Sequence, residues 1–246
     1  MAYGVEDVVG LVFKRNTILS DQIIHQILIS AEKEAEAPRP ARKLSQSLDS
    51  SQYRLWRMDE IREFIGEIYG IPTLYTFDCI KPFAYKADFA RYCIINHFGG
   101  WYVDLMVEVI SLPSEGNCEL IAFRDRNHQS TSWNVQNAFF YSIKNSPILK
   151  SAIEDVECNV RQRNIGKNPL FPTGPTVFGR AIAKASQKSV IMLGDLKWYR
   201  YGRSKYLFED GSLIAKGKKN GQQHQLEVQG GNSYRKMWES RDIYED

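Results

Sequence analysis

No stretch of this sequence approaches the roughly 20 consecutive apolar residues that a membrane-spanning helix needs. The N-terminal region also lacks a charged segment followed by an apolar one, the arrangement typical of a secretory signal. No internal repeat and no low-complexity tract is present. These absences exclude a repeat architecture and favour a cytoplasmic protein.

Cysteine is scarce, and its spacing excludes the common structural zinc sites. The four cysteines form no C-x-x-C pair and have no nearby histidine at zinc-ligand spacing: Cys79, Cys93, Cys118 and Cys158. We therefore expect reduced thiols that are mostly buried.

The charge balance shows only a mild positive excess, with a formal net charge of +3 and a pI of about 8.5. This excess is too small to predict a nucleic-acid partner. Residues 198–203, WYRYGR, interleave aromatic and basic side chains that could stack bases, but the chain contains no nucleic-acid-binding signature. The excess suits phosphorylated ligands or peripheral association with an anionic membrane surface.

Length and composition predict a single domain over residues 1–246. With 43% hydrophobic and 12% aromatic residues, the chain can bury one sizeable core. Candidate strands alternate with candidate helices along the chain. This order favours an α/β fold with a mostly parallel, Rossmann-like central sheet and flanking helices.

The predicted strands are short runs rich in apolar residues: 21–29, with His25 and Gln26 at or near its end, 74–77, 120–123 and 135–141. Helical spacing of apolar residues predicts helices over 53–69 and 147–161. Residues 30–52 are charged, then proline-bearing, then serine-rich, so we expect an exposed loop without a core of its own.

The run 82–110, PFAYKADFARYCIINHFGGWYVDLMVEVI, carries the most specific pattern of the chain. Apolar residues recur at helical spacing over 83–98, and Gly99-Gly100 marks the end of that helix. The almost continuously apolar run 101–110 predicts a strand buried on both faces. Because a carboxylate is costly to bury there, we expect Asp104 at the end of the strand, where open α/β sheets bind ligands.

Asp88 and Arg91 lie three residues apart and share one face of the predicted helix. They could present their side chains to the same crevice as Asp104. The pattern alone equally allows a second interpretation, in which Asp88 and Arg91 form a local ion pair and Asp104 caps a turn.

The segment KADFARYCIINHFGGWYVDLMVEV resembles the signature of DXD-type glycosyltransferases. That family is often assigned to capsular polysaccharide synthesis and is related to yeast α-1,6-mannosyltransferases and to the glucosylating domains of large clostridial toxins. Residues 23–27, IIHQI, are similar to its first strand, 136–138, QNA, to its mid-chain asparagine segment, and 173–175, TGP, to a later loop. The resemblance implies a GT-A architecture.

The resemblance also implies a reaction. It is the transfer of a sugar, with retention, from a UDP- or GDP-sugar to a saccharide or glycolipid acceptor, in bacterial surface polysaccharide synthesis. A Golgi location would require a membrane anchor outside this sequence, whereas a bacterial cytosolic enzyme requires none.

Site residues are implied by the same resemblance. Positions matching Asp88 and Arg91 hold the donor sugar and its phosphates, and the position of Asp104 holds a divalent ion, Mn²⁺ or Mg²⁺; these three form the implied catalytic set. Further donor contacts are implied for five residues: His25, Gln26, Gly100, Tyr102 and Asn137. An acceptor-side wall is implied for Thr173, Gly174 and Pro175.

The chain departs from the family pattern at Met106, where a second carboxylate is expected. A thioether is a soft ligand that suits neither Mn²⁺ nor Mg²⁺. Glu108 would lie roughly 13 Å from Asp104 along an extended strand, unless the strand breaks. Three possibilities follow: an enzyme that uses basic side chains in place of the ion, an enzyme that binds an ion weakly through Asp104 and C-terminal ligands, or a protein that binds the donor without turning it over.

The C-terminal part has the weakest sequence patterns. Residues 197–246 are expected to form a hairpin or loops over the site, in which Trp238 could anchor a closing segment. His128 is expected in a solvated loop.

Overall fold

The structure is a computed structural model that describes residues 23–125, 134–185, 189–199, 202–219 and 232–245. Its first elements are β1 (Ile24–Leu28), α1 (Arg39–Gln46), β2 (Tyr53–Arg57), α2 (Met58–Tyr69), α3 (Ile71–Cys79), α4 (Phe83–Phe98), β3 (Gly100–Val103) and β4 (Glu108–Val109). The later ones are β5 (Leu120–Asp125), β6 (Val135–Ser142), α5 (Pro147–Arg161), α6 (Pro175–Ala183), β7 (Ile191–Lys197), β8 (Arg203–Leu207), β9 (Leu213–Lys219) and α8 (Tyr234–Glu239).

Among the described residues, nine strands form one sheet in the order β2-β1-β3-β6-β5-β7-β8-β9-β4. The pairs β1–β2, β1–β3 and β5–β7 are parallel, and the other pairs are antiparallel. The α/β class is therefore confirmed, but the prediction of a mostly parallel sheet is wrong. The sheet is mixed because β6 returns antiparallel between β3 and β5, and because β7, β8 and β9 follow one another antiparallel without a crossover helix.

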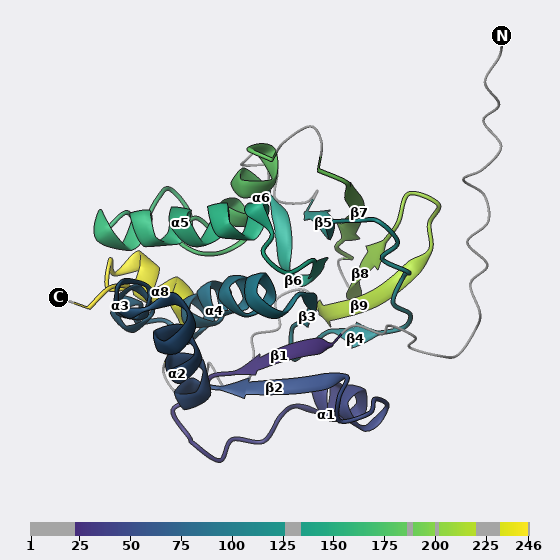
Figure 1. The fold of residues 1–246 in the computed structure, drawn as a ribbon, viewed down its shortest axis with the longest axis horizontal. Helices are drawn as coiled ribbons and strands as arrows, with labels where there is room; N and C mark the ends of the chain where they lie inside the picture. The colour runs from purple at the N-terminus through teal and green to yellow at the C-terminus, as the bar shows by residue number, and fades with distance from the viewer. Residues whose placement is uncertain (1–22, 126–133, 186–188, 200–201, 220–231, 246) are drawn as a thin grey trace, which may run out of the picture.

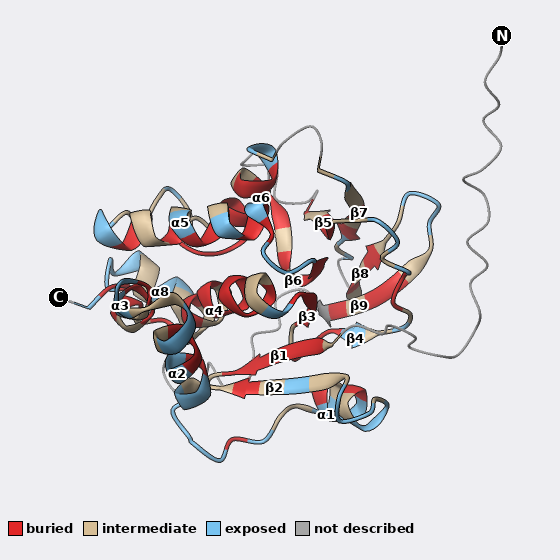
Figure 2. Ribbon diagram, viewed as in Figure 1, coloured by how far each residue is buried: buried red, intermediate tan, exposed pale blue. Residues whose placement is uncertain are grey.

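Two cores lie on opposite faces of the sheet. Helices α2 to α6 cover one face, with α4 and α5 packed together (Figure 1), and most of α4 is buried (Figure 2). Successive residues of β6 alternate between the cores: the Phe139 ring stacks 5.1 Å from Trp101 on one face, whereas Phe140 lies 4.9 Å from Phe178 on the other. This alternation follows from the two-residue period of a strand.

The junction of α4 and β3 is set by two glycines. The backbone N–H of Gly99 closes the helix on the carbonyl of Ile95 at 2.8 Å, and both glycines have positive φ, 72° at Gly99 and 94° at Gly100. A Cβ on Gly100 would lie 2.3 Å from the carbonyl oxygen of Ile23. Glycine is therefore required where β3 passes close to β1, and the predicted helix over 83–98 is confirmed.

Four local predictions are wrong. The run 101–110 is not one strand buried on both faces, because β3 ends at Val103 and the separate strand β4 starts at the exposed Glu108. Residues 53–57 form β2 rather than the start of a helix, because they pair in parallel with β1 and bury Trp56. Residues 74–77 lie inside helix α3, which begins just after Gly70 with Pro72 in its first turn. The segment 30–52 is not only an exposed loop, since α1 buries Ala41 and Leu44 against the rest of the protein.

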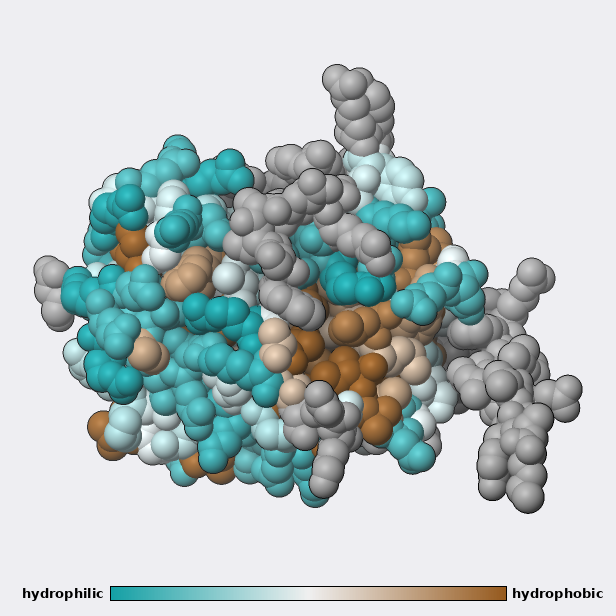
Figure 3. Space-filling view, turned by 90° about the horizontal axis from the view of Figure 1, so that it is seen from above, coloured by the Kyte–Doolittle hydropathy of each residue, from teal (hydrophilic) through white to brown (hydrophobic). Residues whose placement is uncertain are grey.

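None of the helices in the described parts of the chain is long and apolar enough to cross a membrane. Seen from above, hydrophilic side chains cover most of the left part of the molecule, and apolar side chains gather in its right part (Figure 3).

Candidate functional site

Helix α4 directs Asp88 and Arg91 toward the end of β3, where Arg91 is only 5% exposed. One Nη atom of Arg91 lies 3.0 Å from Asp88 Oδ1. The other Nη donates to the carbonyl of Asn137 at 2.8 Å, and Nε donates to the carbonyl of Ala87 at 3.0 Å. A buried guanidinium needs this many partners to offset the loss of water.

Asp88 accepts hydrogen bonds from two further elements. Asn137, on β6, donates its amide N–H to Oδ1 at 2.9 Å, and the Thr173 hydroxyl donates to Oδ2 at 3.0 Å. Burial raises the pKa of the Asp88 carboxyl above its usual range, while the charge of Arg91 and the two hydrogen bonds act in the opposite direction. The carboxylate is thus fixed in place before any ligand binds.

Asp104 follows the last residue of β3, as predicted, and its backbone N–H donates to the carbonyl of Ala138 at 2.8 Å. The hydroxyl of Tyr102 donates to Asp104 Oδ1 at 2.9 Å, and Arg91 lies 3.8 Å from the same oxygen. Arg91 also packs over the ring of Tyr102, 4.4 Å from its centroid. The Asp104 side chain is 43% exposed whereas that of Asp88 is 14% exposed, so Asp104 is the more accessible carboxylate.

We call this group of side chains the Asp88 cluster: Asp88, Arg91, Tyr102, Asp104, Asn137 and Thr173. Its members come from α4, β3, β6 and the loop before α6. The local ion pair between Asp88 and Arg91 is present, and strand and loop residues bind both side chains as well.

His25 and Gln26 lie inside β1 rather than at its end, and both are fully buried. Gln26 donates to the carbonyl of Val103 at 3.1 Å and accepts from the hydroxyl of Tyr53 at 2.8 Å. The indole N–H of Trp56 donates to His25 Nδ1 at 3.0 Å, and burial lowers the pKa of His25 to about 3. These contacts give the two side chains a role in holding β1, β2 and β3 together; their contact with a donor stays a prediction.

The segment Thr173-Gly174-Pro175 packs directly against Asp88. A Cβ on Gly174 would lie 3.1 Å from Asp88 Oδ2, and the hydroxyl of Tyr92 donates to the carbonyl of Thr173 at 3.0 Å. Pro175 begins helix α6. The loop predicted on the acceptor side is therefore also a structural part of the cluster.

The donor set after Asp104 does not suit a divalent ion. The chain turns there, with the N–H of Val107 donating to the carbonyl of Asp104 at 2.9 Å, and Glu108 starts a separate strand. Glu108 is paired with Arg203 at 2.5 Å, and Met106 offers only a thioether. Across the residues that the structure describes, no three His, Cys, Asp or Glu side chains gather as a metal site. These residues do not fit Mn²⁺ or Mg²⁺.

Sequence reasoning missed the residues that hold the Asp88 cluster and its neighbouring strands in place through hydrogen bonds. Tyr92 accepts from Asn137 at 2.9 Å and joins α4 to the 173–175 loop; its place directly after Arg91 was the available signal. Tyr53 and Trp56 donate hydrogen bonds to the side chains of Gln26 and His25 in β1. Arg203 donates to the carbonyl of Met106 at 3.3 Å and so holds the turn after Asp104. No local pattern marked these three.

The C-terminal predictions have a mixed outcome. The expected hairpin is present as β8 and β9, and Trp238 lies in α8, where it donates to the carbonyl of Ile165 at 2.8 Å. A role of Trp238 in anchoring a closing segment stays a prediction. His128, Arg200 and Tyr201 lie outside the described residues.

Residues 25–116 match the family model of the glycosyltransferase sugar-binding region containing the DXD motif. An uncharacterized glycosyltransferase of Acanthamoeba polyphaga mimivirus is 36% identical over 87 residues, which cover 34% of this chain and 34% of the relative. The matched part thus spans about a third of that relative. The predicted resemblance to DXD-type glycosyltransferases is confirmed for this segment, which contains Asp88, Arg91 and Asp104.

Two solved structures share a weaker likeness. The PaToxG glycosyltransferase has a TM-score of 0.48 and 16% identity, covering 67% of this chain and 69% of its own. The ligand-free glycosyltransferase domain of the YGT toxin has a TM-score of 0.43 and 11% identity, covering 62% and 55%.

Proposed function

We propose that this protein transfers a sugar from a nucleotide-sugar donor to a saccharide or glycolipid acceptor. The observation that carries the proposal is the Asp88 cluster, in which the three acidic and basic residues of the matched segment meet Asn137 and Thr173 from outside it. Residues far apart in the chain thereby converge on Asp88 and Arg91, and Arg91 lies beside the accessible Asp104 carboxylate at the end of β3.

Asp104 would contact the donor sugar. Its carboxylate is exposed on one side and oriented on the other by Tyr102, so it can accept hydrogen bonds from sugar hydroxyls. A nucleoside diphosphate leaves with negative charge, and preorganised positive charge lowers the barrier to its departure. One Nη atom of Arg91 lies 3.8 Å from Asp104 Oδ1. The guanidinium would therefore supply a fixed positive charge beside this site, in the place of a divalent ion.

The proposal extends to a GT-A architecture, transfer with retention, and a cytoplasmic role in bacterial surface polysaccharide synthesis. These extensions are supported by the sequence resemblance alone. They name the acceptor class to test first, which is a saccharide or a glycolipid.

A second candidate function is donor binding without turnover. It is favoured by Met106, which stands where the family pattern has its second carboxylate, and by Glu108, whose carboxylate is engaged by Arg203. In this case the fold would hold a nucleotide sugar, or a partner protein, without transferring the sugar.

The test measures binding and turnover of UDP- and GDP-sugars with and without Mn²⁺. We expect Asp104→Asn to reduce turnover about 100-fold or more, because it removes the accessible charge of the site, while the unfolding transition stays in place. The matched control is Asp210→Asn, which changes an exposed aspartate in the β8–β9 turn.

The outcomes separate the candidates. If no nucleotide sugar binds, the glycosyltransferase proposal is wrong. If a donor binds but turns over only in Met106→Asp, the protein is a binding form. Turnover that persists in EDTA supports the use of Arg91, whereas its complete loss shows that an ion is required.

A further inference from the structure

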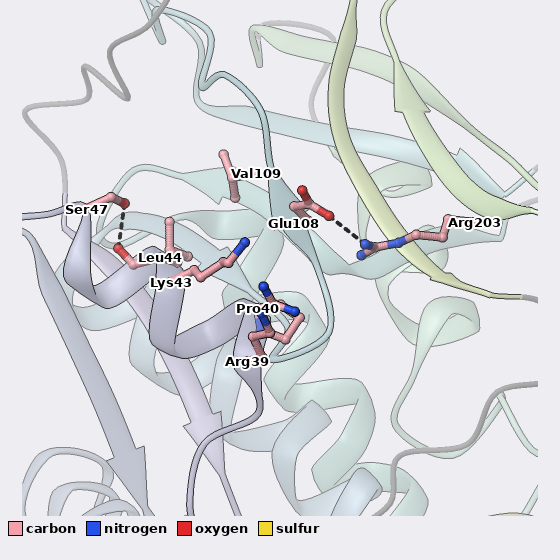
Figure 4. A pocket seen from close by; sticks show the side chains of 8 residues that line it. All are labelled: Arg39, Pro40, Lys43, Leu44, Ser47, Glu108, Val109 and Arg203. Carbon is pink, nitrogen blue, oxygen red and sulfur yellow. Dashed lines mark hydrogen bonds and ion pairs between the residues drawn. The ribbon is translucent and has the colours of Figure 1, made fainter.

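A cavity of about 350 Å³ opens between α1, β4 and β8, apart from the Asp88 cluster. Three cationic side chains line it, together with one carboxylate and an apolar wall: Arg39, Lys43, Arg203, Glu108, Leu44 and Val109. None of the side chains of the Asp88 cluster lines it. We call it the cationic pocket (Figure 4).

Arg203 is fixed in the wall of the pocket. Its Nε donates to the carbonyl of Gly217 at 2.7 Å, and one Nη donates to the carbonyls of Met106 and Lys216 at 3.3 and 3.2 Å. The other Nη binds Glu108 at 2.5 Å. A guanidinium has five N–H groups, so these four bonds leave one N–H for a ligand.

Arg39 and Lys43 supply the positive charge of the pocket that a ligand could bind. They lie four residues apart on α1 and point toward the segment that carries Glu108 and Val109 (Figure 4). Within the described parts of the chain, neither has a carboxylate at ion-pair distance. Like charges at this spacing repel each other, and α1 has no acidic residue in its first turn to offset Arg39.

The charges of the lining residues leave a positive excess. Three cations face one carboxylate, and that carboxylate is already paired with Arg203. A ligand that enters the pocket therefore meets Arg39 and Lys43 of α1 on one side and the fixed Arg203 on the other. A carboxylate carries one negative charge on two oxygens, whereas a phosphate group carries up to two charges on three or more oxygens and so matches the positive excess of the lining better.

We infer that the cationic pocket binds the phosphate group of a ligand whose attached apolar portion lies against Leu44 and Val109. The inference rests on the cavity and its charges, not on the proposed transfer reaction. The pocket adjoins the turn after Asp104, because Arg203 binds the carbonyl of Met106 and Glu108 follows two residues later. The phosphate could belong to the nucleotide donor or to a second, phosphorylated ligand.

The experiment titrates the full chain with inorganic phosphate and with phenyl phosphate by calorimetry at low salt. The test variant is R39Q/K43Q. The matched control is K33Q/R42Q, which also removes two positive charges: Arg42, on α1, is paired with Glu36, and Lys33, in the loop before α1, is paired with Asp59, both in exposed ion pairs. We expect saturable binding to the unchanged protein, about tenfold weaker binding to the test variant, and unchanged binding to the control.

Two results would overturn the inference: equal weakening in both double variants, which would mean a general surface charge effect, or the absence of saturable phosphate binding. A separate titration with UDP and GDP identifies the source. If R39Q/K43Q weakens nucleotide binding as much as phosphate binding, the phosphate is that of the donor; if nucleotide binding is unchanged, the pocket serves a second phosphorylated ligand. Failure of both nucleotides to bind would count against the proposed function and leave the phosphate result intact.

Discussion

The Asp88 cluster and the cationic pocket use the same kinds of side chain in opposite ways. In the cluster, the paired Arg91 and Asp88 side chains are 6% and 14% exposed, and other residues of the protein already hydrogen-bond to both. In the pocket, the paired Arg203 and Glu108 are 31% and 51% exposed, and the two cations of α1 have no such partner among the described residues. The cluster is preorganised, whereas the pocket keeps charge available for a ligand.

The difference follows from position in the sheet. The cluster lies between α4 and the central strands β3 and β6, where burial makes an unpaired charge costly. The pocket lies at the outer end of the sheet, where β4 pairs only with β9 in the described structure and α1 is close by. Cationic side chains there stay hydrated, so leaving them without an ion-pair partner costs little free energy.

The largest effect expected from this contrast is on stability. Arg91→Ala should reduce the free energy of unfolding by about 3–5 kcal/mol, because Asp88 is left buried without its cation. Glu108→Gln breaks the exposed pair and should change it by less than about 1 kcal/mol. Urea unfolding at pH 7 measures both. Similar losses in the two variants would mean that burial does not separate the two regions.

A second comparison uses two glycines with positive φ, one at the start of β3 and one in the β8–β9 turn. Gly100 has a φ of 94° and its Cβ would meet the Ile23 carbonyl, whereas Gly211, in the β8–β9 turn, has a φ of 83° and open space around it. Gly211→Ala should cost about 1 kcal/mol from backbone strain alone. Gly100→Ala should cost about 2–4 kcal/mol, because overpacking adds to the strain. Equal costs in thermal unfolding would show that the close approach of β1 and β3 does not matter.

Acid should weaken the strands that support the cluster. The pKa of His25 is lowered from 6.5 to about 3 in the fold, so the unfolded chain binds a proton that the folded chain does not. The resulting stability is complete above pH 6.5 and is lost as the pH falls toward 3. From pH 7 to pH 5, this single group should cost about 2 kcal/mol.

The measurement is urea unfolding at pH 7 and pH 5 for the unchanged protein, His25→Asn and a control, His97→Asn. The pH dependence should shrink in His25→Asn and persist in the control. No histidine lines the cationic pocket, so hydrogen exchange should rise at pH 5 in β1 and β3 before it rises in β8 and β9. A pH dependence that survives in His25→Asn would contradict this assignment.

Sequence reasoning succeeded where local signals agree. The bounds of α4 and α5 match the predicted helices over 83–98 and 147–161, because apolar periodicity and the flanking proline or glycine residues lie within the same short segments. It failed at 53–57 and 74–77, whose short apolar and aromatic runs fit a strand or a helix equally well. Pairing with β1 decided the first case, and the start of α3 after Gly70 decided the second.

Local patterns in the sequence were enough to predict the helix that carries Asp88 and Arg91, the glycines that end it, and the place of Asp104 at the end of a strand. These features depend on neighbouring residues and on backbone conformations that only glycine adopts readily. Asn137 and Thr173 were predicted near the site through resemblance, without their contacts to Asp88. Only the tertiary structure joined them, paired Glu108 with Arg203 and left Arg39 and Lys43 without such a partner in the described structure, because long-range packing decides which charges are buried together and which stay in water.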